Sequence, residues 1–121
     1  MRIFKLKLFH KWASKEKLTD EALHQAVSEM AKGLVEANLG GQVYKKRVAI
    51  PGRGKRGGAR TIIAFKIENK AFFIYGFAKN KRDNISAQEL KALKRLAQEL
   101  LGYDNKQLLT ALKAGQVIEV I

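Results

Sequence analysis

Lysine and arginine side chains are concentrated in one third of the sequence, between residues 42 and 82. This basic stretch contains twelve cations and a single acid, Glu68, in a chain of 121 residues whose formal net charge is +13. Its cations are Lys45, Lys46, Arg47, Arg53, Lys55, Arg56, Arg60, Lys66, Lys70, Lys79, Lys81 and Arg82. Charge of one sign repels itself in a folded domain, so such a stretch is typical of a protein with a polyanionic partner. Nucleic acid is the simplest partner of this kind, and an acidic protein is the alternative.

Cations alone can also cleave RNA, because RNA carries its own nucleophile in the 2′-OH group. The reaction needs a base for that proton, positive charge to stabilise the phosphorane, and an acid for the departing 5′-oxygen. A lysine crowded by other cations has its charged form disfavoured and becomes a credible base, while arginine offers a fixed fork of donors to phosphate oxygens. The alternative is that the same residues bind a phosphate backbone without any chemistry.

Other kinds of active site are not supported by the sequence. The chain has no cysteine, and its two histidines, His10 and His24, lack the companions of a metal site or a nucleophile triad. The acids show no paired pattern of a two-metal nuclease or a glycosidase. A phosphate-binding loop would need glycine where Ala49 stands and a hydroxyl where Arg56 stands. We therefore expect no metal and no cofactor.

The cations must be positioned by the strands and helices around them. The order of these predicted elements indicates an α+β domain, in which helices at both ends of the chain pack on a small, mostly antiparallel sheet. Alternating hydrophobicity predicts strands at residues 2–9, 43–50 and 116–121, and two continuous apolar segments predict strands at residues 61–67 and 71–77. Apolar residues at helical spacing predict helices at residues 20–34, 86–101 and 105–114, and residues 10–17 are expected to form a short helix that carries Trp12. Thr19 is the expected N-cap of the second helix, and the last two begin with the capping boxes Ser86/Glu89 and Asp104/Gln107.

The basic stretch contains a glycine-rich segment and two apolar strands, which determine how its cations are presented to a ligand. Residues 51–58 contain four glycines and one proline, so we expect a mobile basic loop there. The strands at 61–67 and 71–77 are apolar on both faces and are expected to form a hairpin in the middle of the sheet. On the second strand, Tyr75 and Phe77 either stack on a substrate or are buried in the core, depending on which face they occupy.

Length and hydrophobicity fit one compact domain, since 46% of the residues are hydrophobic. The N-terminus alternates charged and apolar residues and does not resemble a signal peptide. No apolar run approaches the roughly 20 residues that a membrane span requires. We expect a soluble, cytoplasmic protein.

The segment Arg60-Thr61-Ile62-Ile63-Ala64-Phe65-Lys66, followed by residues 72–85 (FFIYGFAKNKRDNI) and a helix, resembles the RelE/HigB toxins of bacterial toxin–antitoxin pairs, in the RelE/ParE superfamily. The similarity runs from the first strand to about Leu101, so we interpret residues 1–121 as one toxin domain and residues 103–121 as its C-terminal extension. The resemblance implies a small basic fold like that of microbial RNases, which enters the ribosomal A site, cuts mRNA, and is inhibited by a partner antitoxin.

The resemblance also suggests roles for individual residues. Arg60 matches an arginine that stabilises the transition state, and residues 45–47 with Lys55 match the region of acid–base residues. The leaving-group arginine of the family aligns with Asn80 and its stacking tyrosine with Ser86, so Lys81 or Arg82, and Tyr75 or Phe77, are expected to take those roles. The predicted catalytic residues are therefore Lys46, Arg60, Lys81 and Arg82. The predicted RNA-binding residues are Lys45, Arg47, Arg53, Lys55, Arg56, Tyr75 and Lys79.

The sequence is compatible with three functions. The first is a ribosome-dependent mRNA endonuclease that inhibits translation. The second is a non-catalytic basic module that blocks the ribosome, and the third is a gyrase inhibitor of the ParE branch. If the protein is a toxin, an acidic, amphipathic helix of its antitoxin is expected to bind the basic cleft.

Overall fold

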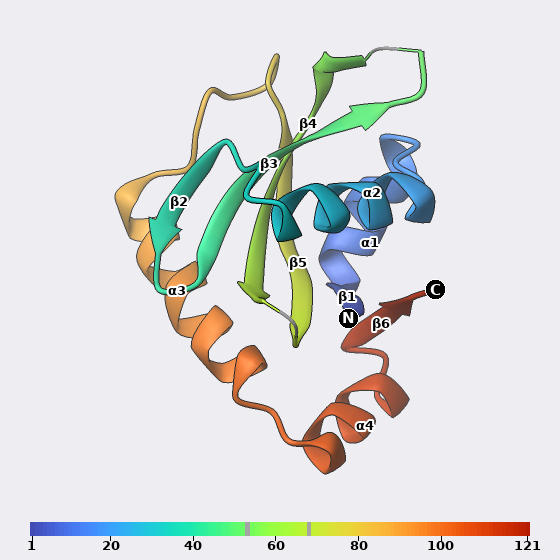
Figure 1. Cartoon of the computed structure of the whole chain (residues 1–121), viewed down its shortest axis with the longest axis vertical. Helices are drawn as coiled ribbons and strands as arrows, with labels where there is room; N and C mark the ends of the chain where they lie inside the picture. Colours follow the sequence, from blue (N-terminus) through green and yellow to red (C-terminus); the bar gives the residue numbers. More distant parts are fainter. Residues whose placement is uncertain (53, 68) are drawn as a thin grey trace.

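The computed structural model describes residues 1–52, 54–67 and 69–121, with the backbone alone for residues 54–57. In these residues one six-stranded sheet carries four helices (Figure 1). The strands are β1 (Arg2–Leu6), β2 (Ala37–Gly40), β3 (Val43–Ile50), β4 (Gly54–Lys66), β5 (Lys70–Ala78) and β6 (Val117–Val120). The helices are α1 (Lys7–Lys15), α2 (Asp20–Ala31), α3 (Ala87–Leu101) and α4 (Asn105–Lys113). The predicted α+β class is confirmed.

The strands follow the order β2-β3-β4-β5-β1-β6 across the sheet. Every neighbouring pair is antiparallel except β1 and β5, which run parallel. β4 and β5 pair with each other in the interior of the sheet, so the predicted central hairpin is confirmed. The long β3–β4 hairpin projects beyond the rest of the sheet at the top of Figure 1.

Two hydrophobic cores lie on opposite faces of the sheet. Neighbouring residues of β4 illustrate the division, because Ile63 packs in one core and Ile62 in the other. The first core includes Phe9 of α1 and Leu23 of α2, and the second includes Leu100 of α3. The sheet is therefore the middle layer between α1 with α2 and α3 with α4.

The N-cap and the two capping boxes that the sequence predicts are formed at the starts of α2, α3 and α4. The hydroxyl of Thr19 accepts a hydrogen bond from the Ala22 amide at 3.2 Å. Both capping boxes are formed, with Ser86 and Glu89 at the start of α3 and Asp104 and Gln107 at the start of α4. Each box satisfies backbone N–H groups that a helix leaves without intrahelical partners.

Two predicted boundaries near the N-terminus are wrong. The first strand ends at Leu6 instead of residue 9, because α1 begins at Lys7 and buries Phe9 and Ala13 while Leu8 is 78% exposed. The second helix ends at Ala31 instead of residue 34, and the positive φ of Gly33 turns the chain away from it. The short strand β2 that follows is absent from the sequence prediction, since its four residues carry no strong alternation.

The prediction of a basic loop over residues 51–58 is also wrong for most of that segment. β4 begins at Gly54, where it pairs with Ile50, and continues for 13 residues. Pairing with β3 supplies the backbone hydrogen bonds that compensate for the low strand propensity of glycine. Within the described ranges, no helix is long and apolar enough to cross a membrane.

Candidate nucleic-acid interface

Two arginines lie side by side where β3 pairs with β4. Arg47 and Arg60 are direct cross-strand partners, so their side chains leave the same face of the sheet. Both turn toward Glu36, which precedes β2: the Glu36 Oε1 atom lies 3.0 Å from Nε of Arg47 and 3.4 Å from Nε of Arg60. Two like charges that would repel each other thus share one carboxylate oxygen.

The two arginines differ in their access to solvent. The Arg47 side chain is 44% exposed, whereas that of Arg60 is 4% exposed. The Nη1 atom of Arg60 is buried and has no hydrogen-bond partner among the described residues. A buried guanidinium donor without an acceptor is costly, so this atom marks a place where an acceptor would be stabilising.

On its other side, Arg60 pairs across the strands with Phe77 of β5. The guanidinium carbon of Arg82 lies 5.7 Å from the centre of the Phe77 ring, in the range of a cation–π contact. Arg82 also donates a hydrogen bond from Nη1 to the Tyr75 hydroxyl at 3.1 Å. The turn after β5 is therefore joined to the Arg60 face through two aromatic side chains.

A β-bulge at Ile74 places those aromatic residues. Ile62 pairs with Tyr75 and Ile63 pairs with Phe73, so Ile74 is an extra residue in β5. Because the bulge shifts the alternation, Phe73 packs in the α1/α2 core and Phe77 in the opposite core. Without it, strict alternation would put both on one face.

The Arg82 guanidinium forms a bidentate ion pair with the Glu89 carboxylate of α3. The distances are 2.6 Å from Nη2 to Oε1 and 3.0 Å from Nη1 to Oε2. The Arg82 hydrogen bonds lower the pKa of Glu89 to about 2, and the same contacts raise the pKa of Arg82. Oε1 of Glu89 also accepts from the Ser86 amide, which joins the ion pair to the start of α3.

Lys46, predicted as a catalytic residue of the acid–base region, is placed differently from Arg60. It pairs with Thr61 and therefore leaves the opposite face of β3 from Arg47. Its ammonium is buried, lying 2.7 Å from Glu29 Oε1 and donating to the Leu34 carbonyl at 2.8 Å. The structure thus joins Arg47 with Arg60, and Tyr75 with Arg82, but does not bring Lys46 to the face of Arg60.

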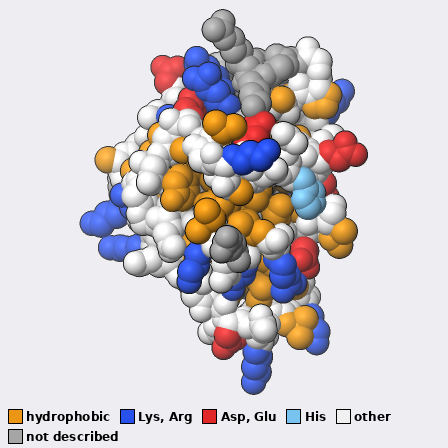
Figure 2. All heavy atoms as spheres, in the orientation of Figure 1, with side chains coloured by type: hydrophobic (Ala, Val, Ile, Leu, Met, Phe, Trp, Pro, Cys, Tyr) orange, Lys and Arg blue, Asp and Glu red, His pale blue; other side chains and the backbone are white. Residues whose placement is uncertain are grey.

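The remaining predicted residues lie around these groups. Lys45 is half-buried opposite Ile62, and Lys79 and Lys81 are exposed after β5. Arg53 lies outside the described residues, as do the side chains of Lys55 and Arg56. On the face shown in Figure 2, Lys and Arg side chains lie around a central group of hydrophobic side chains.

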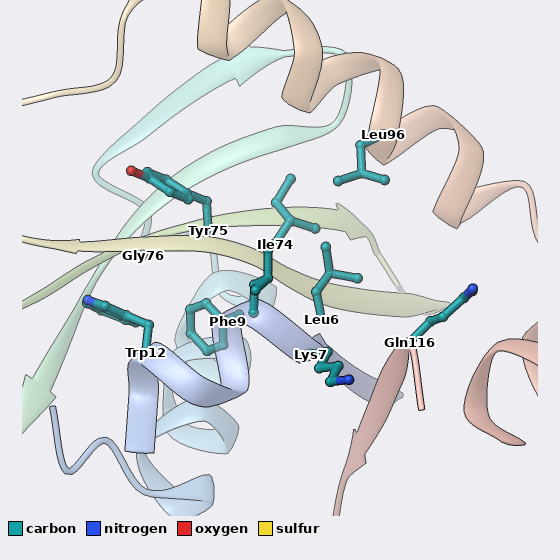
Figure 3. A pocket seen from close by; sticks show the side chains of 10 residues that line it. Leu6, Lys7, Phe9, Trp12, Ile74, Tyr75, Gly76, Leu96 and Gln116 are labelled. Carbon is teal, nitrogen blue, oxygen red and sulfur yellow. The ribbon is translucent and has the colours of Figure 1, made fainter. Parts of the chain in front are cut away.

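Two cavities adjoin the predicted residues. A hollow of about 330 Å³ is lined by Leu34, Val35, Glu36, Lys46 and Arg47, and so opens beside the paired arginines. A larger one, of about 590 Å³, lies between α1, β5 and α3; Trp12 and Tyr75 stand at one end of it and Gln116 at the other (Figure 3). The lining of the larger cavity is mainly apolar, so its chemistry suits hydrophobic groups better than phosphate.

The carboxylates that hold the cations were missed by sequence reasoning. Glu29, Glu36 and Glu89 each lie within 3.4 Å of a predicted catalytic cation. Glu89 was recognisable only as a capping residue, and the position of Glu36 depends on the bend before β2. Among the described residues, no three histidine, aspartate or glutamate side chains gather as metal ligands would.

Fold and site together define a small, strongly basic α+β protein with paired arginines on one face of its sheet. The family model described as the RelE toxin of the RelE/RelB toxin–antitoxin system matches residues 1–120. The chain therefore belongs to the RelE toxin family and is the toxin of a toxin–antitoxin system, with a cognate RelB-type antitoxin as partner. Toxins of this family generally inhibit translation. No curated protein gives a significant match to the sequence.

Proposed function

We propose that this toxin is a ribosome-dependent mRNA endonuclease that cleaves RNA with lysine and arginine side chains and without a metal ion. The observation that supports this proposal most directly is the pairing of Arg47 with Arg60 beside an open hollow. Two guanidinium groups at one point can bind the non-bridging oxygens of a phosphodiester and stabilise the charge that grows on them in the transition state.

The other roles follow from position. Lys81 is exposed in the turn after β5 and is proposed to protonate the departing 5′-oxygen. Arg82 and the half-buried Tyr75 are proposed to hold the RNA next to the cleaved bond, since aromatic rings stack on bases, whereas Phe77 is buried in the core and supports them from below. Lys46 is proposed as the general base, for which its ammonium must leave Glu29 and lose a proton before it can act.

A second candidate function is supported by the ion pairs themselves. Lys46, Arg60 and Arg82 are held by Glu29, Glu36 and Glu89, as expected for cations that shape a binding surface and do no chemistry. Such a protein would occupy the ribosome and block it. It would arrest growth, and its binding would weaken steeply with salt.

Inducible expression followed by mapping of transcript 5′ ends separates these functions. We expect cuts in phase with codons, lost on Arg60→Ala and strongly reduced on Arg47→Ala, with circular dichroism confirming that each variant is folded. Arg95→Ala, at an exposed position of α3, is the matched control and should cut like the wild type. Growth arrest with intact transcripts would favour the blocking module, and DNA damage with intact transcripts would favour a gyrase inhibitor.

A further inference from the structure

Glu36 lies where a phosphate group would be expected. Its Oε1 atom is within 3.4 Å of Nε on both Arg47 and Arg60, and its side chain is 21% exposed at the edge of the 330 Å³ hollow. A carboxylate presents negatively charged oxygens to a guanidinium in much the same way as a phosphate does. Arg47 and Arg60 can therefore bind either a carboxylate or a phosphate. The position between them has room for only one of these two anions at a time.

Arg60 needs an anion whether or not RNA is present. Arg47 and Arg60 are directly opposed on adjacent strands, an arrangement that is destabilising for like charges. Arg60 is also nearly inaccessible, and its Nη1 atom lacks a partner among the described residues even with Glu36 in place. The carboxylate thus offsets part of the repulsion but leaves one buried donor of Arg60 without an acceptor among the described residues.

The Glu36 carboxylate can leave the two arginines without any movement of the backbone. It lies between α2 and β2, and its backbone amide is fixed by a hydrogen bond to the Lys45 carbonyl at 2.9 Å. Only its side chain has to rotate into solvent, and the rotation breaks its contacts with Arg47 and Arg60. Rotation removes the carboxylate from the Nε atoms of both arginines, of which Arg47 lines the hollow.

We propose that the Glu36 carboxylate occupies the phosphate position between Arg47 and Arg60 in the free toxin and is displaced from it by the RNA phosphate. The inference rests on the proposed function only in taking RNA as the source of the phosphate. Glu36 is then an internal competitor, so RNA binds only the fraction of molecules whose site is open. A minor open state is typically 0.1–10% populated, so removing the competitor should tighten binding by about tenfold or more.

The first test measures the binding of a 2′-O-methyl RNA hexamer, which cannot be cleaved, to toxin made by cell-free synthesis. Glu36→Gln keeps the size of the side chain and removes its charge, and we expect it to bind the hexamer about tenfold more tightly than the wild type does. Glu119→Gln is the matched control, because it also deprives a sheet arginine, Arg2, of its carboxylate at 2.9 Å, and it should bind like the wild type. An unchanged or weaker affinity of Glu36→Gln would overturn the proposal.

The second test uses inorganic sulfate as the anion, with sodium chloride at equal ionic strength as the reference. Glu36→Gln should unfold at a lower temperature than the wild type in chloride, and sulfate should restore more of that loss than it does for Glu119→Gln. Equal responses of the two variants to sulfate would contradict the proposal. Loss of cleavage on Glu36→Gln with unchanged hexamer affinity would make Glu36 a general base and would also overturn it.

The outcome is separate from that of the proposed function. Tighter hexamer binding by Glu36→Gln together with intact transcripts in arrested cells would support the phosphate site and refute cleavage. Codon-phased cuts together with unchanged hexamer affinity would support cleavage and refute the internal competitor.

Discussion

Arg82 and Glu89 form a contact whose strength depends on pH. The pKa of Glu89 is lowered from 4.5 to about 2 because its ionised form accepts hydrogen bonds from Arg82. A carboxylate with a depressed folded-state pKa contributes stability that is present above its ordinary pKa and is lost as pH falls through its folded value. The contribution should therefore disappear between about pH 4.5 and pH 2.

Glu89→Gln tests this assignment while keeping the capping box, because glutamine also accepts a hydrogen bond from the Ser86 amide. At pH 7 the variant should be less stable than the wild type, and the difference should shrink toward pH 2 in urea unfolding curves at low salt. Glu99→Gln, at an exposed position of the same helix, should show no such pH-dependent difference. A difference that stays constant from pH 7 to pH 2 would mean that Glu89 acts through something other than its charge.

Lys46 is a second residue whose structural and catalytic roles can be separated. Its ammonium is buried between the Glu29 carboxylate and the Leu34 carbonyl, and removing one partner of a buried ion pair costs about 3–5 kcal/mol. Lys46→Ala should therefore lower the free energy of unfolding by about 3 kcal/mol. Lys79→Ala, at an exposed lysine, should change it by less than about 0.5 kcal/mol. A Lys46→Ala variant of normal stability that fails to cleave RNA would instead favour the role of general base.

At the scale of elements, the sequence predicts what is determined locally. The starts of α2, α3 and α4 were correct because a capping side chain and the amide it binds lie within a few residues of each other. The hairpin of β4 and β5 was correct because both segments are strongly apolar. These features need no knowledge of distant contacts.

The errors concern pairing between segments distant in the chain. β4 extends back to Gly54 because β3 lies beside it, and β2 exists because it pairs with β3. The same is true of the site, since the bulge at Ile74 decides which face Tyr75 and Phe77 occupy. The sequence predicts Arg47 and Arg60 as site residues because both are arginines of the basic stretch. Only the register of β3 and β4 shows that the two residues are neighbours.

Gly76 of β5 illustrates a packing requirement that the sequence leaves hidden. A Cβ atom at this position would overlap the ring of Trp12 in α1, so α1 approaches the sheet closely only because the residue is glycine. Overpacking of this kind typically costs about 1–3 kcal/mol. We therefore expect Gly76→Ala to lower the urea unfolding midpoint.

A double variant provides the control for Gly76. Trp12→Leu removes the ring that the added methyl group would meet, so Gly76→Ala should cost less in the Trp12→Leu background than in the wild type. Equal costs in the two backgrounds would show that Trp12 does not restrict this position.

For the whole molecule, the C-terminal residues complete the sheet. β6 pairs with β1 over four residues at the edge of the sheet, and the RelE family model extends to residue 120. Val117 is buried in one core and Val120 in the other, so this strand seals both layers. The Arg2–Glu119 ion pair, at 2.9 Å, adds an exposed contact between the same two strands.

Deleting residues 116–121 should therefore abolish the folded state. Burial of the two valines alone is worth about 3–6 kcal/mol, against a total stability of about 5–15 kcal/mol for a typical domain. The deletion also exposes the edge of β1 and removes the bond from the Lys7 amide to the Gln116 carbonyl at 3.1 Å, so aggregation is expected as well. Deleting Ile121 alone, which is 94% exposed, should leave the thermal unfolding curve unchanged. If the chain ending at residue 115 unfolds cooperatively at the wild-type temperature, β6 is dispensable and the essential sheet ends at β1.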